Sequence, residues 1–87
     1  MSPGYTIVLL PAVLRVMKKL PADVGRPIKA AIDGLMINPR PNGVKKLTDA
    51  DGTYRIRVGS HRILYTIEDR ILRVTVVDVG DRRDIYR

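Results

Sequence analysis

The stretch Thr53-Tyr54-Arg55-Ile56-Arg57-Val58-Gly59-Ser60-His61-Arg62-Ile63-Leu64-Tyr65 predicts a β-hairpin, around which the rest of the fold can be arranged. Apolar, aromatic and β-branched residues alternate with arginines on both sides of Gly59-Ser60, as in half-buried strands. Glycine at the first of two turn positions favours a type II′ turn, because glycine adopts positive φ without strain. We therefore expect strands at about 54–58 and 61–68, joined by a two-residue turn.

The length of the turn determines which residues of this hairpin face each other. The predicted pairs are Val58–His61, Arg57–Arg62, Ile56–Ile63 and Tyr54–Tyr65. Because successive side chains point to opposite faces, isoleucines and tyrosines form an apolar face, and Arg55, Arg57 and Arg62 lie on the other. Arg57 and Arg62 become direct cross-strand neighbours, where like charges destabilise a sheet. This arrangement indicates a surface that binds an anion; the alternative is two side chains that splay into solvent.

The remaining chain predicts two helices and two further strands. A first strand is expected at residues 5–10, followed by a helix that begins at Pro11, because proline suits the first helical position. Apolar residues at helical spacing continue to residue 35, with Pro27 as a candidate start of the second helix. Beyond the helices we expect a loop at 38–43, a short basic extended segment at 44–47 and a last strand at about 71–79.

The last strand is expected to pair with the hairpin through a two-residue turn at Asp69-Arg70. The predicted pairs are Ile67–Leu72, Tyr65–Val74 and Ile63–Val76. In this register the neighbouring positions Thr75 and Val77 bring no acid to the arginine face. The order β-α-α-β-β-β predicts one α+β domain over residues 1–87, with two N-terminal helices packed on one face of a small, mainly antiparallel sheet.

Composition narrows the classes of function. The formal net charge is +7, with eleven arginines against five lysines, which favours an acidic partner such as nucleic acid. The chain has no cysteine and a single histidine, so we expect neither a disulfide nor a zinc site. The longest apolar run is too short to span a membrane, and no basic region precedes it. We therefore expect a soluble cytoplasmic protein with no metal and no membrane partner.

A resemblance to a known family rests on three segments: Tyr54-Arg55-Ile56-Arg57, His61-Arg62-Ile63-Leu64-Tyr65 and Gly80-Asp81-Arg82-Arg83-Asp84-Ile85-Tyr86. They resemble the RelE toxins of bacterial and archaeal type II toxin–antitoxin systems, in the RelE/ParE superfamily. The order of elements is similar along nearly the whole chain, and so is the loop Asn38-Pro39-Arg40-Pro41 before Lys46-Leu47.

This resemblance implies an activity and a set of partners. The activity is cleavage of messenger RNA in the ribosomal A site, in which the ribose 2′-OH attacks the adjacent phosphate without a metal or cofactor. The partners are the ribosome with its messenger RNA and a cognate acidic antitoxin of the RelB kind. We expect this partly disordered antitoxin to cover the arginine face or to displace the Arg82–Tyr86 tail.

The resemblance also implies roles for individual residues. Arg62 matches an arginine that binds phosphate, and Arg82 matches one that stabilises the pentavalent transition state. Tyr86 matches a tyrosine that orients the base and its ribose. Further phosphate contacts are expected from the remaining cations of these segments, namely Arg55, Arg57, Arg83, Lys45 and Lys46.

The general base is the point where this chain departs from the family. Arg55 and Arg57 stand where well-studied members carry lysines, one of which is a candidate base. A guanidinium stays protonated near neutral pH and cannot accept a proton. Asp81 and His61 are the acid–base candidates that remain, since many relatives carry histidine at the place of Asp81. The hairpin register, however, turns His61 to the opposite face, where a structural contact with Asp78 is the alternative.

Two other functions stay open at this point. A ParE-like toxin has the same fold but binds DNA gyrase and cuts nothing. A catalytically inactive module that only binds its antitoxin is the third reading, because the lysine base is missing.

Overall fold

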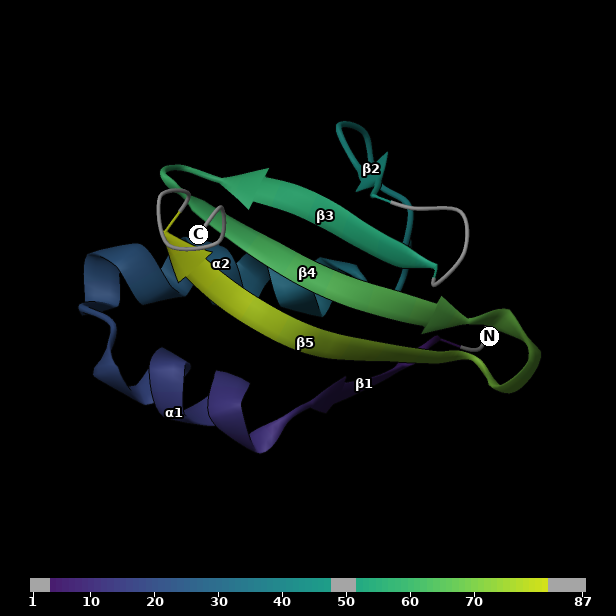
Figure 1. The fold of residues 1–87 in the computed structure, drawn as a ribbon, viewed down its shortest axis with the longest axis horizontal. Helices are drawn as coiled ribbons and strands as arrows, with labels where there is room; N and C mark the ends of the chain where they lie inside the picture. The colour runs from purple at the N-terminus through teal and green to yellow at the C-terminus, as the bar shows by residue number, and fades with distance from the viewer. Residues whose placement is uncertain (1–3, 48–51, 82–87) are drawn as a thin grey trace.

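A computed structural model describes residues 4–47 and 52–81 of the chain. These residues form a sheet and two helices, with the helices on one side of the sheet (Figure 1). The elements in chain order are β1 (Thr6–Leu9), α1 (Pro11–Lys19), α2 (Ala22–Gly34), β2 (Lys45–Lys46), β3 (Thr53–Val58), β4 (His61–Glu68), the 3-10 turn η1 (Asp69–Ile71) and β5 (Arg73–Asp81).

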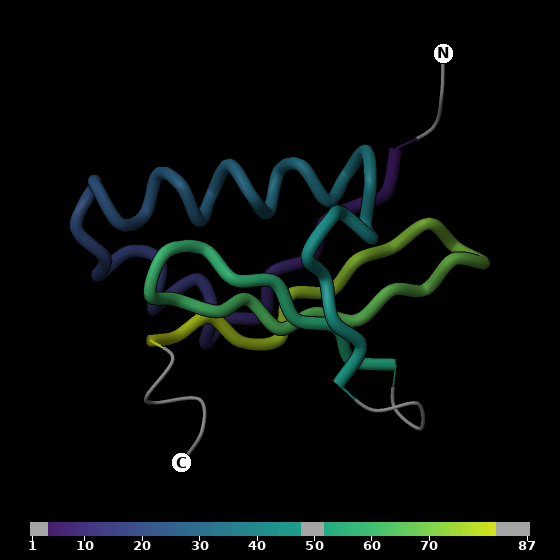
Figure 2. Tube along the Cα trace, turned by 90° about the horizontal axis from the view of Figure 1, so that it is seen from above, coloured from purple at the N-terminus to yellow at the C-terminus, as the bar shows by residue number. Residues whose placement is uncertain are grey.

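The sheet has five strands in the order β1-β5-β4-β3-β2. β1 pairs with β5 in parallel, and the other neighbours are antiparallel. Viewed from above, α2 runs in a layer of its own beside the strands (Figure 2). The predicted α+β class, with two helices on one face of a mainly antiparallel sheet, is confirmed. The short basic segment predicted before the hairpin is the edge strand β2.

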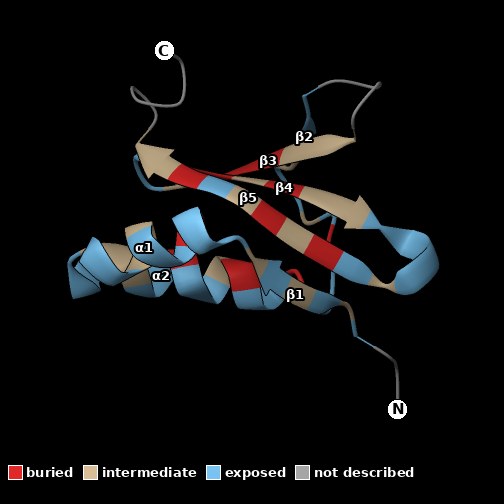
Figure 3. Ribbon diagram, turned by 60° about the horizontal axis from the view of Figure 1, so that its bottom comes forward, coloured by how far each residue is buried: buried red, intermediate tan, exposed pale blue. Residues whose placement is uncertain are grey.

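The apolar core fills the space between the two layers. Buried positions recur along β5 and on both helices (Figure 3). The buried apolar residues are Val13, Ile28, Ile32, Leu35, Ile56, Ile63, Tyr65, Val74, Val76 and Val79. The isoleucines and Tyr65 of the hairpin therefore lie on the helix-covered face, as their alternation predicts.

The second helix begins earlier than the position of its proline predicts. α2 starts at Ala22, and Pro27 lies inside it. The amides of Val24 and Gly25 donate to the carbonyl of Pro21, which completes a first turn upstream of the proline. Pro27 removes one backbone hydrogen bond, but the burial of Ile28 and the apolar stripe that follows it favours one continuous helix.

The β3–β4 hairpin has the predicted register. Val58 pairs with His61, Arg57 with Arg62, Ile56 with Ile63 and Tyr54 with Tyr65. Gly59 has φ +60°, and no other turn residue has positive φ, as a type II′ turn requires.

The β4–β5 connection differs from the prediction, and the register moves with it. In place of a two-residue turn, η1 is followed by Leu72 in the left-handed region, with φ 52°. β5 therefore begins at Arg73, and Val74 rather than Leu72 faces Ile67. A bulge between Leu64 and Tyr65 shifts the pairing again, so that Val79 rather than Val76 faces Ile63. Because Val74, Val76 and Val79 all point inward, the core tolerates this change of register.

Candidate functional site

The face of the sheet away from the helices carries two cross-strand pairs of like charge. Arg57 on β3 faces Arg62 on β4, and Lys45 on β2 faces Arg55 on β3. Since Arg55 and Arg57 are two residues apart on one strand, all four cations belong to the same face. We call this set, Lys45, Arg55, Arg57 and Arg62, the basic face. The Lys45–Arg55 pair was not predicted, because the register of a two-residue strand cannot be read from its sequence.

Two guanidiniums of the basic face are more buried than an exposed sheet surface implies. Arg62 is only 2% exposed and Arg55 only 7%, whereas Arg57 and Lys45 are exposed. The Nε of Arg55 is buried and has no hydrogen-bond partner among residues 4–47 and 52–81. A buried donor without an acceptor costs about 1–3 kcal/mol. An anionic oxygen beside Arg55 would supply the missing acceptor.

The surroundings of Arg62 on β5 also differ from the prediction. The residue that faces Arg62 is Gly80, which has no side chain to offer. Thr75 faces Thr66 instead, because the register has moved. The acid Asp78 faces Leu64, two pairs further along β4.

The two acid–base candidates lie together, on the other side of the sheet. His61 pairs directly with Asp81 across β4 and β5. Both line a cavity of about 280 Å³ that is also lined by Val16 and Leu20 of α1 and by Asp78. The His61 ring lies 3.4 Å from the Ser60 hydroxyl. The structure thus places His61 and Asp81 on the helix side and does not bring them to the basic face.

Three predicted residues of the C-terminal tail, Arg82, Arg83 and Tyr86, lie outside the described residues. Lys46 is exposed at the end of β2, where it pairs with Tyr54. The roles assigned to all of these residues by resemblance therefore stay predictions.

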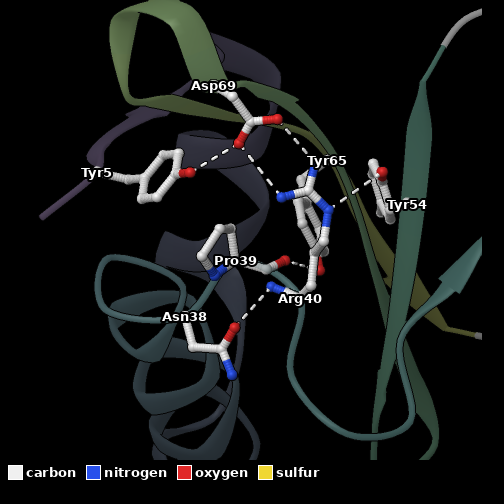
Figure 4. A network of polar contacts seen from close by, with 7 residues as sticks. All are labelled: Tyr5, Asn38, Pro39, Arg40, Tyr54, Tyr65 and Asp69. Carbon is white, nitrogen blue, oxygen red and sulfur yellow. Dashed lines mark hydrogen bonds and ion pairs between the residues drawn. The ribbon is translucent and has the colours of Figure 1, made fainter.

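A polar network joins the loop after α2 to the sheet, and sequence reasoning did not find it (Figure 4). The Arg40 guanidinium donates to both carboxylate oxygens of Asp69, at 3.2 and 2.9 Å. Tyr5 donates its hydroxyl to Asp69 at 2.7 Å. These hydrogen bonds, from Arg40 first and Tyr5 second, lower the pKa of Asp69 to about 2. No local sequence signal links Arg40 to Asp69, because 29 positions separate them.

The same network includes two stacked tyrosines. Arg40 Nε donates to the Tyr54 hydroxyl at 3.4 Å, and the Tyr54 and Tyr65 rings stack with centroids 5.9 Å apart. Tyr65 is fully buried and donates its hydroxyl to the carbonyl of Pro39 at 2.8 Å. Burial raises the pKa of Tyr65 to about 12. Tyr65 therefore lies on the predicted apolar face, and its hydroxyl bonds to a protein carbonyl.

An apolar groove runs between β1 and the two helices. It measures about 560 Å³, and its apolar lining includes Ile7, Leu9, Leu14 and Met17. Lys18, Arg26 and Lys29 stand on its rim with a single acid, Asp33. Leu14 is 44% exposed there. The groove therefore combines exposed apolar surface with positive charge.

The described residues hold neither a cluster of metal ligands nor a membrane-spanning helix. Within residues 4–47 and 52–81, no group of three or more histidine, cysteine or acidic side chains is placed to bind a metal ion. No helix in this part of the chain is long and apolar enough to cross a membrane.

Comparisons with known proteins agree on one group of relatives. A family model described as ParE toxin of type II toxin-antitoxin system, parDE, matches residues 7–86. Putative toxin RelE1 of Methanocaldococcus jannaschii is 32% identical over 80 residues, which are 86% of this chain and 87% of that protein. Toxin RelG of Mycobacterium tuberculosis is 31% identical over 84 residues, which are 95% of this chain and 97% of that one.

Solved structures show the same fold. The toxin in the toxin–antitoxin complex RelBE2 of Mycobacterium tuberculosis superposes with a TM-score of 0.77 at 28% identity, covering 93% of this chain and all of that one. The archaeal RelE–RelB complex of Pyrococcus horikoshii gives a TM-score of 0.81 at 23% identity, covering 90% of this chain and 94% of that one.

Proposed function

Because this chain belongs to the RelE family of toxins of type II toxin–antitoxin systems, in the RelE/ParE superfamily, we propose that it is a ribosome-dependent endoribonuclease. It cleaves messenger RNA in the ribosomal A site and so inhibits translation. The observation that carries this proposal is the basic face, where two pairs of like charge meet and the buried Arg55 Nε lacks an acceptor.

The proposed reaction is an in-line displacement at phosphorus. The ribose 2′-oxygen forms a bond to the adjacent phosphorus and loses its proton, while the bond from phosphorus to the 5′-oxygen breaks. The leaving oxygen takes up a proton, and the products carry a 2′,3′-cyclic phosphate and a 5′-OH. Negative charge grows on the phosphate oxygens during this step, and Arg57 and Arg62 are the pair that would stabilise it.

The basic face supplies positive charge but no proton acceptor. Guanidiniums remain protonated near neutral pH, so Arg55 and Arg57 orient phosphate without taking the 2′-OH proton. His61 and Asp81 lie on the helix side, away from this face. We therefore propose that the reaction depends chiefly on orientation and electrostatic stabilisation, with Arg82 and Tyr86 as the tail residues that contact the nucleotide and with the ribosome supplying proton transfer.

A cognate antitoxin is the second proposed partner. Solved relatives include RelE–RelB complexes. An acidic, RelB-like segment that folds on contact would neutralise the basic face, and its amphipathic part would fit the groove rimmed by Lys18, Arg26 and Lys29. In this role the antitoxin and RNA compete for the same arginines.

One observation favours a different target. The matching family model is described as a ParE toxin, and a ParE-like gyrase inhibitor would have this fold without cutting RNA. The arginines at positions 55 and 57, which replace the family lysines, leave a catalytically inactive antitoxin-binding module as the third reading.

The proposal is tested on ribosomes that carry a defined messenger and an empty A site, with RNA ends mapped by primer extension. Arg82→Ala removes the arginine matched to transition-state stabilisation, and Arg57→Gln removes a cation of the basic face. Arg15→Gln on α1 is the matched control, because it lowers the net charge equally away from this face. Messenger without ribosomes runs alongside.

Cleavage at the A-site codon that needs ribosomes and is lost in Arg82→Ala and Arg57→Gln, but not in Arg15→Gln, supports the proposal. No cleavage, together with inhibition of gyrase supercoiling, would transfer the assignment to a ParE-like toxin. Inactivity in both assays with intact antitoxin binding would identify an inactive module.

A further inference from the structure

The polar network of Figure 4 reaches Tyr54, which directly precedes Arg55 on β3. We infer that the Arg40–Asp69 ion pair is a positioning device that holds β2, and with it Lys45, beside Arg55 on the basic face. Arg40 and Asp69 are then positioning residues, since neither belongs to the basic face itself. This inference rests on the proposed function, because it gives Lys45 and Arg55 a phosphate to bind.

β2 is the shortest strand of the described sheet. It has two residues, lies at the edge of the sheet and, in the part of the chain that the structure describes, pairs with β3 through Lys45–Arg55 and Lys46–Tyr54. One backbone hydrogen bond follows, from the Leu47 amide to the Thr53 carbonyl at 2.8 Å. So short an edge strand depends on the chain before it for its position.

The chain before β2 is anchored firmly at Arg40. Asp69 binds both terminal nitrogens of its guanidinium, and this two-point contact defines its orientation better than a single hydrogen bond does. From Arg40 a tight turn, closed by the Val44 amide and the Pro41 carbonyl at 3.1 Å, leads directly into Lys45. Few degrees of freedom therefore separate the anchor from the lysine.

The anchor also contacts the partner strand. Arg40 Nε donates to the hydroxyl of Tyr54, which pairs with Lys46 and directly precedes Arg55 on β3. The guanidinium carbon lies 5.4 Å from the centre of the Tyr54 ring. Arg40 thus contacts the start of β3 directly and precedes β2 by one tight turn, so it constrains both strands that carry the Lys45–Arg55 pair.

Removing the anchor should have a local effect. Arg40 and Asp69 are both about half exposed, and ion pairs of this kind contribute little to global stability. The core between the helices and the sheet does not include them. We expect β2 to separate from β3 more often while the rest of the fold stays intact.

The test compares Asp69→Asn with Glu68→Gln. The two substitutions remove one negative charge from adjacent positions, so each raises the formal net charge from +7 to +8. Only Asp69 binds Arg40; Glu68 contacts Arg73 at 3.7 Å. Added positive charge alone strengthens RNA binding, so weaker binding by Asp69→Asn would have to come from lost geometry.

Two quantities are measured. Hydrogen exchange of the Leu47 amide reports on β2, and the Leu10 amide, which donates to Val76 at 3.3 Å, is the control at the other edge of the sheet. Binding to a short single-stranded RNA with 2′-O-methyl riboses, which cannot be cleaved, is followed by fluorescence anisotropy. Both are repeated in a Lys45→Ala background.

We expect Asp69→Asn to accelerate exchange at Leu47 but not at Leu10, and to weaken RNA binding by about three- to tenfold, as the loss of one phosphate contact would. Glu68→Gln should do neither. In the Lys45→Ala background Asp69→Asn should weaken binding no further, because the two changes act on the same contact.

Unchanged hydrogen exchange at Leu47 in Asp69→Asn would overturn the inference. It would also be overturned if Asp69→Asn weakened RNA binding as much in the Lys45→Ala background as in the wild type. Wild-type protein that neither binds nor cleaves RNA would refute the proposed function instead. In that case the exchange of Leu47 still decides whether the ion pair positions β2.

Discussion

The Arg57–Arg62 pair leads to a prediction that links stability to function. Arg57→Gln removes the charge of the exposed member of the pair and keeps an unbranched polar side chain, although a shorter one. We expect the variant to unfold at a higher temperature than the wild type and to cleave less RNA. Both effects have one cause: a repulsion that costs stability in the free protein is offset when phosphate binds between the cations.

The magnitude follows from the position of the pair. Like charges directly opposite each other on neighbouring strands cost about 0.2–1 kcal/mol. The exposure of Arg57 places the interaction in a high dielectric, where two unit charges ~4 Å apart repel by about 1 kcal/mol, which agrees with that range. For a chain of this size the gain corresponds to a rise of roughly 1–8 °C in Tm.

The assay is thermal unfolding in buffers of low and high ionic strength, without phosphate. Salt screens exposed charges, so the difference between Arg57→Gln and wild type should shrink as salt is added. Arg15→Gln on α1 controls for the lower net charge. A variant that is less stable than wild type, a gain that does not depend on salt, or an equal gain in Arg15→Gln would each refute the reasoning.

Three further predictions concern the fold around the site. Tyr65→Phe leaves the Pro39 carbonyl without its buried donor, and urea unfolding should show a loss of about 1–3 kcal/mol; an unchanged midpoint would contradict this. Because Arg40 and Tyr5 lower the pKa of Asp69 to about 2, its stabilising contribution is present above pH ~4 and is lost as the pH falls toward 2, so acid unfolding of Asp69→Asn should lack that component. Leu72→Ile keeps the side-chain volume but puts a β-branched residue at φ 52°, a conformation that β-branched residues adopt least readily, so the variant should unfold at a lower temperature than the wild type; equal stability would show that the turn relaxes freely.

Much of the candidate site could be predicted because it depends on local features. Gly59-Ser60 forms a two-residue turn, so Val58 must pair with His61. The next pair along the two strands is then Arg57 with Arg62. The depth at which Arg62 and Arg55 are buried could not be predicted, because burial depends on segments that the hairpin meets only in the folded chain. The Lys45–Arg55 pair escaped prediction for a similar reason, since two residues of β2 contain too little pattern to define a register.

The class of the fold, the β3–β4 register and the face on which the arginines lie can all be derived from the amino-acid sequence. These features follow from strand alternation and from a turn of defined length, which act over a few residues. The β4–β5 register, where Leu72 takes up a left-handed conformation and a bulge adds a residue, is visible only in the folded chain, and so is the ion pair between Arg40 and Asp69. Both features depend on packing between segments distant in the chain. Several β4–β5 registers would keep Val74 and Val76 buried, and contacts with the rest of the core determine which register forms.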